Sequence, residues 1–130
     1  MRVVLDCNVV ISAARAIGVC GDVIVEASRN HVIVLSAPIL YEYQAVASRP
    51  KHDYYRESLF AIIKEIEKVA IVVKPAETLF GIRDPDDEVY LATAVAGGAV
   101  LVTGNTRDFT EPKYGPVEIL SPRAFLDRIK

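Results

Sequence analysis

The run Val3-Val4-Leu5-Asp6-Cys7-Asn8 contains the pattern that decides the fold. Three aliphatic residues predict a short strand, and a helical pattern over residues 8–16 follows almost at once. Asp6 therefore lies where a strand ends and a helix begins. Because Asp is an ordinary residue for a helix cap, Asp6 on its own indicates no function.

The rest of the chain repeats this alternation of short apolar runs and longer helical patterns. Four further strands are predicted at residues 32–35, 69–73, 99–102 and 117–120. Further helices are predicted at residues 22–30, 36–48, 55–68, 86–97 and 122–129, with loops at 75–85 and 104–116. Strands joined through helices indicate a parallel sheet with helices on both faces, because a parallel connection needs a long crossover. The predicted fold class is α/β.

Length and composition predict a single domain over residues 1–130. With 52% hydrophobic residues and a net charge of only −2, the chain is unlike a disordered protein. Its apolar runs are strand-sized, whereas a membrane span needs about 20 apolar residues, and no leader pattern precedes the first strand. We expect a soluble, cytoplasmic protein. Cys7 and Cys20 lack the spacing of a zinc site or disulfide scaffold, which favours buried thiols.

Acidic residues gather where strands end and helices begin. Glu42 lies in the predicted helix 36–48, the acids of the run 84–88 begin another helix, and Asn105 and Asp108 follow the strand 99–102. Each has an ordinary explanation: a solvated helix flank, acids that complement a helix dipole, or a turn. However, these segments and Asp6 all fall at one edge of a parallel sheet, so we expect them to converge on one pocket.

Such a pocket favours a hard metal ion as cofactor. Three or more carboxylates close together repel and raise one another's pKa unless a cation neutralises them. Oxygen ligands without His or Cys select Mg²⁺ or Mn²⁺. An ion of this kind activates water and holds the oxygens of a phosphodiester for in-line attack, so the pattern favours phosphodiester hydrolysis.

Outside the acidic set the chain is basic. Without six acids, eleven Asp and Glu residues face fifteen Lys and Arg residues, a net charge of +4 that suits a polyanion. The six are Asp6, Glu42, Asp84, Asp86, Asp87 and Asp108. The segment 49–56 is a candidate for contacts to phosphates and bases, and a solvated charged face is the ordinary alternative. Its basic and aromatic residues are Arg49, Lys51, His52, Arg56, Tyr54 and Tyr55.

Four segments resemble the motifs of the PIN domain family, ribonucleases that include the VapC-type toxins of toxin-antitoxin systems. The run 5–8 is similar to the first motif, Asp-x-Asn, and Glu42 with Val46 is similar to the second acid. Asp87 with the run 88–94 resembles the helix of the third acid. The turn 102–105 resembles the last motif, in which many members carry Asp in place of Asn105. A toxin subgroup shares this turn and the run 83–87.

The resemblance implies a three-layer α/β/α sandwich around a parallel five-stranded sheet in the order 3-2-1-4-5. It implies an endoribonuclease that cleaves single-stranded RNA with metal-activated water, using Mg²⁺ or Mn²⁺ and leaving 5′ phosphate and 3′ hydroxyl ends. It also implies the toxin of a toxin-antitoxin pair, with an antitoxin that blocks the acidic groove and a homodimer as the assembly. The implied catalytic residues and metal ligands are Asp6, Glu42 and Asp87.

Further residues have supporting roles in this resemblance. Asp86 is an additional candidate ligand and Asp84 a substitute or supporting group, while Asn8 would orient Asp6 and Thr103 would fix the loop. Either Asn105, through its amide oxygen, or Asp108 would complete the metal site. The candidate RNA contacts are Arg49, Lys51 and Arg56.

Two other functions are compatible with the same residues. The first is a PIN-like module that binds RNA or a protein without cutting, because Asn105 has weakened the metal site. The second is a phosphate-accepting receiver or phosphatase-type domain, which would need another acid beside Asp6 and a late Lys. The sequence has Leu5 and Asn8 at the first place and Ser121-Pro122 at the second. Four tyrosines would suit either a dimer contact or the core, namely Tyr41, Tyr43, Tyr54 and Tyr55.

Overall fold

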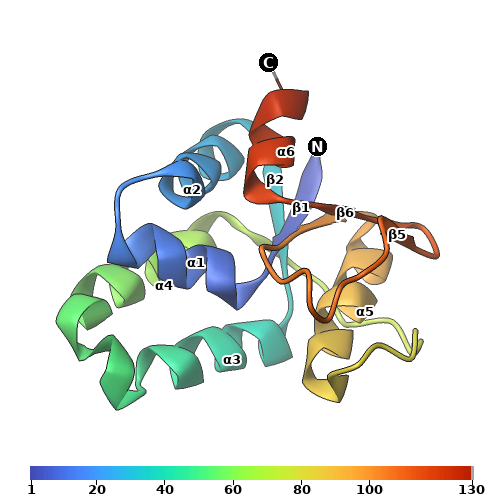
Figure 1. The fold of residues 1–130 in the computed structure, drawn as a ribbon, viewed down its shortest axis with the longest axis horizontal. Coiled ribbons are helices and arrows are strands. Elements are labelled where there is room, and N and C mark those ends of the chain that lie inside the picture. The colour runs from blue at the N-terminus through green and yellow to red at the C-terminus, as the bar shows by residue number, and fades with distance from the viewer. Residues whose placement is uncertain (130) are drawn as a thin grey trace.

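The computed structural model describes residues 1–129, in which strands and helices alternate along the chain (Figure 1). The strands are β1 (Arg2–Leu5), β2 (Val32–Leu35), β3 (Ile71–Val72), β4 (Val100–Val102), β5 (Lys113–Tyr114) and β6 (Val117–Leu120). The α-helices are α1 (Cys7–Arg15), α2 (Val19–Asn30), α3 (Ala37–Ala47), α4 (Arg56–Val69), α5 (Glu88–Gly97) and α6 (Pro122–Arg128). Short 3-10 helices, η1 (Pro50–Tyr55) and η2 (Pro85–Asp87), precede α4 and α5. The α/β class is confirmed.

The described strands form one sheet in the order β3-β2-β1-β4-β6-β5. β1 pairs in parallel with β2 and β4, β2 with β3, and β4 with β6, so the predicted order of five parallel strands is confirmed. The sheet is not purely parallel, however, because β5 adds a sixth strand antiparallel to β6. β5 lies in the segment 104–116 predicted as a loop. Its two residues are too few to show a period, and Gly115, with φ of 55°, allows the reversal between the strands.

Two element boundaries also differ from the prediction. The third strand was expected at 69–73, but Val69 completes the last turn of α4, and only Ile71 and Val72 pair with β2 at the sheet edge. The segment before α4 forms η1, which Pro50 begins, since proline is tolerated in the first turn of a helix. At both boundaries, helix formation thus outweighs the β propensity of a few residues.

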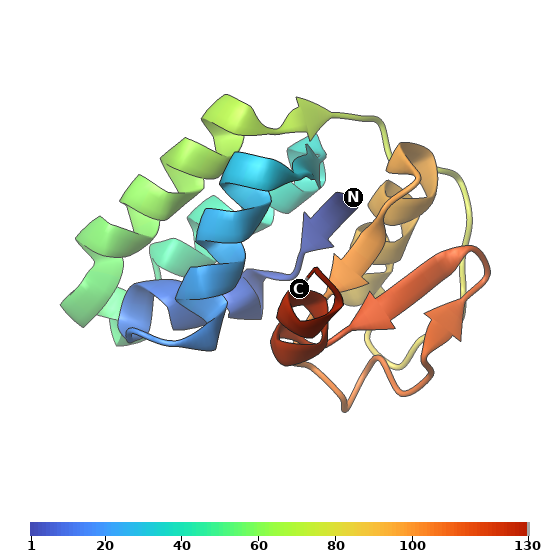
Figure 2. The ribbon, with the colours of Figure 1, turned by 90° about the horizontal axis from the view of Figure 1, so that it is seen from above.

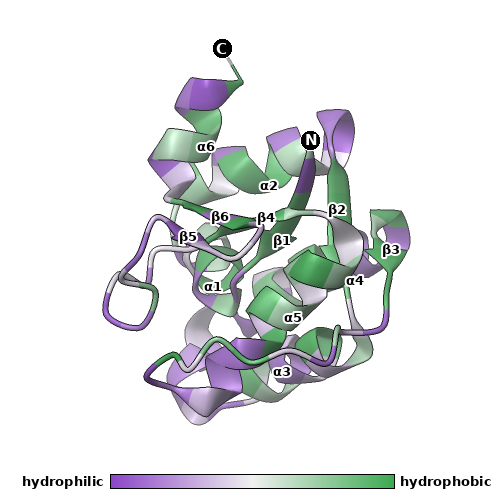
Figure 3. Cartoon of the chain, turned by 90° about the vertical axis from the view of Figure 1, so that its right-hand side faces the viewer, coloured by the Kyte–Doolittle hydropathy of each residue, from purple (hydrophilic) through white to green (hydrophobic). Residues whose placement is uncertain are grey.

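Helices cover the sheet from both sides, as the predicted three-layer sandwich requires. α2 and α6 pack against each other on one side, and α5 packs on β1, β2 and β4 from the other (Figures 1 and 2). The central strands are mostly hydrophobic (Figure 3), and Val3, Val4 and Leu5 of β1 are fully buried. Six of the ten residues of α5 are buried as well. This core fixes the ends of β1 and β4 and the start of α5, where the acids lie.

Within residues 1–129, no single helix is both long and apolar enough to cross a membrane. Only α1 and α2 taken together, as a pair bent by 114°, have the length and composition for such a span.

Close packing between α5 and β2 makes Gly97 sensitive to substitution. A Cβ atom at Gly97 would lie 2.5 Å from Cγ1 of Val34, whereas a Cβ atom at Gly21 in α2 would meet nothing within 4 Å. We expect Gly97→Ala to lower the free energy of unfolding by about 1–3 kcal/mol through overpacking. Gly21→Ala, the matched control, should raise it by about 0.5–1 kcal/mol. Urea unfolding measures both, and equal effects would contradict the packing described.

Candidate active site

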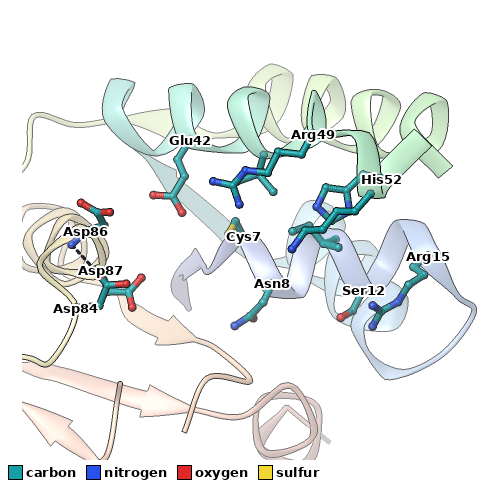
Figure 4. A pocket seen from close by; sticks show the side chains of 13 residues that line it. Cys7, Asn8, Ser12, Arg15, Glu42, Arg49, His52, Asp84, Asp86 and Asp87 are labelled. Carbon is teal, nitrogen blue, oxygen red and sulfur yellow. Dashed lines mark hydrogen bonds between the residues drawn. The ribbon is translucent and has the colours of Figure 1, made fainter. Parts of the chain in front are cut away.

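A pocket at the carboxyl end of β1 runs along one face of α1. Its lining residues on this helix recur at spacings of three and four, which places them side by side. They are Cys7, Asn8, Ile11, Ser12 and Arg15. The cavity has a volume of about 480 Å³, typical of ligand sites, which span roughly 300–1,000 Å³. Figure 4 shows carboxylates at one end and cationic side chains at the other.

Asp6 is buried at the carboxyl end of β1, directly before Cys7 of the pocket lining but not itself part of that lining, with 3% of its surface exposed. It occupies the N-cap position of α1, but its side chain makes no capping hydrogen bond. Instead Thr103 Oγ1 donates to Asp6 Oδ2 over 2.7 Å, and Asn8 Nδ2 donates to the same oxygen over 3.3 Å. Thr103 follows β4, whose Val102 pairs with Leu5 of β1. Strand pairing therefore orients the carboxylate, and Asn8 contacts Asp6 as expected.

Glu42 lies in α3 and lines the pocket. The hydroxyl of Tyr90 in α5 donates to Glu42 Oε1 over 2.7 Å. Burial raises the pKa of Tyr90, so its hydroxyl keeps the proton that it donates. The hydroxyl of Tyr43 donates to the Leu5 carbonyl and attaches α3 to the end of β1. No sequence pattern indicates this role of Tyr90, because its position within an apolar helix is typical of a core residue.

A cluster of three carboxylates lies beside Asp6. One ligand oxygen from each of Asp84, Asp87 and Asp108 falls within 4.8 Å of the others. Asp84 directly precedes η2, and Asp87 is the last residue of η2. Asp108 comes from the loop between β4 and β5. Asp84, considered from the sequence as a substitute or supporting group, is thus a direct member of this cluster. Asp86 lines the pocket but is exposed, and its backbone N–H donates to Asp84 Oδ1 over 3.0 Å.

Asn105 holds Asp108 in this cluster instead of joining it. The Asn105 side chain accepts from the Asp108 backbone N–H over 3.1 Å and donates to Asp108 Oδ2 over 3.0 Å. The Asn105 backbone N–H donates to Thr103 Oγ1 over 2.9 Å, which ties this loop to Asp6 as predicted for Thr103. Of the two residues left as alternatives, Asp108 is the one beside Asp84 and Asp87.

The electrostatics of the cluster suit a divalent cation. Burial, the charge of Asp6 and a hydrogen bond with Asp108 raise the pKa of Asp87 to about 7. Burial also raises the pKa of Asp6, although the Thr103 hydrogen bond opposes this shift. Burial and Asp6 raise the pKa of Cys7, which stays a thiol and offers no thiolate ligand. The atoms available as metal ligands are therefore carboxylate oxygens, which fit Mg²⁺ or Mn²⁺.

The basic end of the pocket contains two of the three candidate RNA contacts. Arg49 and Lys51 line it, together with His52 and Arg15. Arg56 lies outside the pocket lining, since its guanidinium donates to the backbone carbonyls of the segment 47–49. Arg15 was missed because only the packing of α1 brings it near η1. Arg56 thus fixes the segment that carries the other cations.

The tyrosines considered for a dimer contact fall into two groups. Tyr43 is a core residue with 2% of its surface exposed, and Tyr55 is half-buried and hydrogen-bonded to His52. Tyr41 and Tyr54 are largely exposed, at 73% and 99%. Cys7 and Cys20, expected as buried thiols, are free and half-buried.

Comparison with known proteins places this geometry in context. A family model described as PIN domain matches residues 2–107. The fold is similar to the crystal structure of VapBC2 from Rickettsia felis bound to a DNA fragment from their promoter, with a TM-score of 0.67 and 18% identity over 93% of this chain and 98% of that one. It is also similar to VapBC-1 from nontypeable Haemophilus influenzae, with a TM-score of 0.64 and 21% identity over 95% and 99%. No curated protein matches the chain.

The raised pKa of Asp87 predicts a stability that depends on pH when no metal is added. Its pKa rises from 3.8 to about 7 on folding, so stability present below about pH 4 is lost as the pH rises through about 7. Asp87→Asn removes this titration, and its free energy of unfolding should fall less between these pH values than that of the wild type. Urea unfolding in EDTA measures the difference.

The control is Glu65→Gln, which removes an exposed carboxylate of α4. Its pH dependence should match that of the wild type. If the curve of Asp87→Asn also runs parallel to the wild-type curve, the pKa of Asp87 is not raised on folding as described.

Proposed function

Because this chain belongs to the PIN domain family, we propose that it is a metal-dependent endoribonuclease that cleaves single-stranded RNA. The observation that carries the proposal is the convergence of carboxylates from separate segments around Asp87, which lines one pocket with Glu42, has an oxygen within 4.8 Å of one of Asp108, and is affected by the charge of Asp6. Asp6 follows β1, Glu42 comes from α3, Asp87 ends η2 and Asp108 follows β4. A purely structural group of acids would not need a pocket, and it would lower the stability of the fold.

Asp6, Glu42 and Asp87 are the proposed catalytic residues and metal ligands, with Asp108 completing the set. Asp84 and Asp86 support them from η2. When bound, Mg²⁺ or Mn²⁺ would neutralise these carboxylates, lower the pKa of a water molecule and stabilise charge on the phosphate. In the reaction, water adds to phosphorus and the bond to the 3′ oxygen breaks, which leaves a 5′ phosphate and a 3′ hydroxyl.

The neighbouring residues keep the carboxylates in place. Thr103 and Asn8 hold Asp6 through hydrogen bonds to its Oδ2. Tyr90 holds Glu42 in the same manner, and Asn105 holds Asp108. Each partner is neutral and leaves the negative charge of the carboxylate intact. Positioning by neutral donors of this kind preserves affinity for a cation.

The substrate class follows from the two ends of the pocket. A polyanion can reach the carboxylates only with a cation present, while Arg49 and Lys51 offer charges to its phosphates. Single-stranded RNA is flexible enough to enter a pocket, and its bases are free to stack. We propose the cytoplasm as the place where the protein acts.

We further assign the chain to the toxins of toxin-antitoxin pairs. The support is the likeness of its fold to proteins described as VapBC2 and VapBC-1. The proposed partner is an antitoxin that enters the acidic pocket with a basic side chain. The proposed assembly is a homodimer, for which the exposed Tyr41 and Tyr54 are candidate contacts.

A binding module that does not cut is the second candidate, and Asn105 is the observation that favours it. Asn105 stands where many family members carry Asp, so one ligand would be absent. Asp108 lies beside Asp84 and Asp87, however, and supplies a carboxylate from the same loop. We therefore prefer the enzyme, and a cleavage assay separates the two.

Purified protein should cleave a generic single-stranded RNA with Mn²⁺ and lose this activity in excess EDTA. Asp6→Asn should lower kcat/KM by more than about 100-fold, because it removes a ligand, and Thr103→Val by about 10–100-fold, because it removes the support of that ligand. Glu65→Gln, on the exposed face of α4, is the control and should keep full activity. Gel analysis of end-labelled RNA measures the rates.

The chemical groups at the ends of the products distinguish the proposed activity from that of a contaminating nuclease that uses the ribose 2′ hydroxyl. Attack by the ribose 2′ hydroxyl would leave a cyclic phosphate, whereas the proposed reaction leaves a 5′ phosphate. Full activity of Asp6→Asn would overturn the assignment. RNA binding without any cleavage would support the module instead.

Expression of the chain in a bacterial host should stop growth if it is a toxin. Asp6→Asn, produced to the same level, should permit growth, because the arrest depends on the carboxylate site. Growth curves with matched immunoblots measure the effect. Equal arrest by both proteins would show that toxicity does not come from this site.

A further inference from the structure

Glu88, the last acid of the run 84–88, does not share the contacts of its neighbours. It begins α5 directly after Asp87, yet it lines a different hollow from the pocket that Asp87 lines. Its carboxylate accepts from the backbone N–H of Phe80 over 3.0 and 3.2 Å and from that of Ile82 over 3.1 Å. Glu88 therefore holds the loop before η2 against the start of α5.

This loop places Phe80 against the hairpin of β5 and β6 (Figure 2). The ring of Phe80 packs on that of Tyr114 in β5, with centroids 6.2 Å apart and planes at 77°, an edge-to-face arrangement that aromatic pairs prefer. At the hairpin turn, a Cβ atom at Gly115 would lie 3.0 Å from Cε1 of Phe80. Among the described residues, no backbone hydrogen bond joins the segments 73–87 and 104–114. The side chain of Phe80 thus connects two segments that their backbones leave separate.

Tyr114 in turn holds the loop that contains Asp108. Its hydroxyl accepts from the backbone N–H groups of Thr110 and Glu111 over 2.9 and 3.2 Å. Its ring packs edge to face on Phe109, with centroids 6.3 Å apart. Phe109 directly follows Asp108 and is 4% exposed. A continuous series of contacts therefore runs from Glu88 to Asp108, and we call Glu88, Phe80 and Tyr114 the contact network.

The contact network joins the two segments that supply the carboxylate cluster. Asp84 and Asp87 lie at the two ends of η2, directly before Glu88, while Asp108 lies in the loop that Tyr114 holds. Repulsion between the carboxylates favours separation of the segments, so a fixed spacing needs contacts that oppose it. Spacing decides which cation fits. Mg²⁺ requires a nearly octahedral set of oxygens at about 2.0–2.1 Å, whereas Ca²⁺ accepts irregular sets at about 2.3–2.6 Å.

We propose that the contact network sets the spacing between Asp108 and the pair Asp84 and Asp87, and that this spacing makes the cluster select Mg²⁺ over Ca²⁺. Tyr114 is the central positioning residue. The inference rests on the proposed metal-dependent function. A role of Glu88 as a metal ligand is the alternative, but both of its oxygens already accept backbone hydrogen bonds.

The first experiment measures cation binding without RNA. Mn²⁺ is titrated with protein, its free concentration is measured by EPR, and Mg²⁺ or Ca²⁺ then displaces it. In the wild type, Mg²⁺ should displace Mn²⁺ at a lower concentration than Ca²⁺. Tyr114→Phe keeps the ring and removes the hydroxyl, so it should raise the Kd for Mg²⁺ about tenfold. The Kd for Ca²⁺ should change by less than about threefold, because a less regular set of oxygens still suits Ca²⁺.

Two matched controls separate positioning from general destabilisation. Ser121→Ala also removes a hydroxyl that accepts a backbone N–H, that of Ala124 over 3.0 Å, and should leave both Kd values unchanged. Phe80→Leu should reproduce the effect of Tyr114→Phe, whereas Phe60→Leu, at a residue of α4 that is 39% exposed, should not. Parallel shifts for Mg²⁺ and Ca²⁺, or no shift, in Tyr114→Phe and Phe80→Leu would overturn the proposal.

Variants of Glu88 distinguish its hydrogen bonds from its charge. Glu88→Ala should raise the Kd for Mg²⁺ about tenfold, because the loop that carries Phe80 is released. Glu88→Gln keeps an oxygen that accepts from Phe80 and Ile82, and it should recover most of the affinity. If Glu88→Gln binds Mg²⁺ as weakly as Glu88→Ala, the charge of Glu88 acts on the cation and the contact network is not its role.

The second experiment uses RNA cleavage. Excess Mg²⁺ should restore kcat of Tyr114→Phe to the wild-type value, because the carboxylates remain, whereas it should not restore Asp6→Asn. The ratio of Ca²⁺ to Mg²⁺ that halves the rate should be lower for Tyr114→Phe than for the wild type by about threefold or more. An unchanged ratio would contradict the proposed selection.

Failure of this proposal and failure of the function on which it rests give different results. Selection of Mg²⁺ that depends on Tyr114, in a protein that does not cleave RNA, would overturn the ribonuclease and support the contact network. Cleavage that requires Mg²⁺ but shows the same Ca²⁺ sensitivity in all variants would overturn the contact network alone. Absence of Mn²⁺ binding by the wild type would overturn the selection proposed here.

Discussion

The crowding of carboxylates at the end of β1 is the constraint on which the rest of the structure depends. Asp6 is buried there, and Asp84, Asp87 and Asp108 lie within reach of one another. Burial and repulsion by the neighbouring carboxylates together raise the pKa of Asp87. The carboxylates cannot move apart freely, because Val3, Val4 and Leu5 of β1 are fully buried and α5 is packed against β1, β2, β4 and β6. The core thus keeps these carboxylates close together, and a cation bound among them would reduce their repulsion.

The carboxylates are held in position by neutral groups. A hydroxyl holds Asp6, another holds Glu42, and an amide holds Asp108. Within the described residues no Lys or Arg forms an ion pair with these acids. An ion pair would have neutralised the charge that a metal needs, whereas a neutral donor fixes direction and leaves the charge in place.

α1 separates this acidic end from the cations at the other end of the pocket. Asn8 and Arg15 are seven residues apart on this helix. The rise of roughly 10 Å between them exceeds the screening length of about 8 Å at physiological salt, so the two ends keep their opposite potentials. Arg56 contributes from outside the pocket, since it binds the carbonyls at the end of α3 and fixes the loop that carries Arg49 and His52. The same helix that begins at Asp6 therefore defines both ends of the pocket proposed to bind RNA.

The sequence by itself determined the five parallel strands, their order through the family resemblance, and the acids Asp6, Glu42 and Asp87 at the sheet edge. It could do so because apolar periodicity and helix starts are local signals. Only the tertiary structure placed Asp108 beside Asp84 and Asp87, Arg15 in the pocket lining, and the Tyr90 hydroxyl on Glu42. Those outcomes depend on side-chain directions and contacts between segments far apart in the chain, which no local pattern encodes. β5 belongs with them, because two residues become a strand only when β6 is there to pair with them.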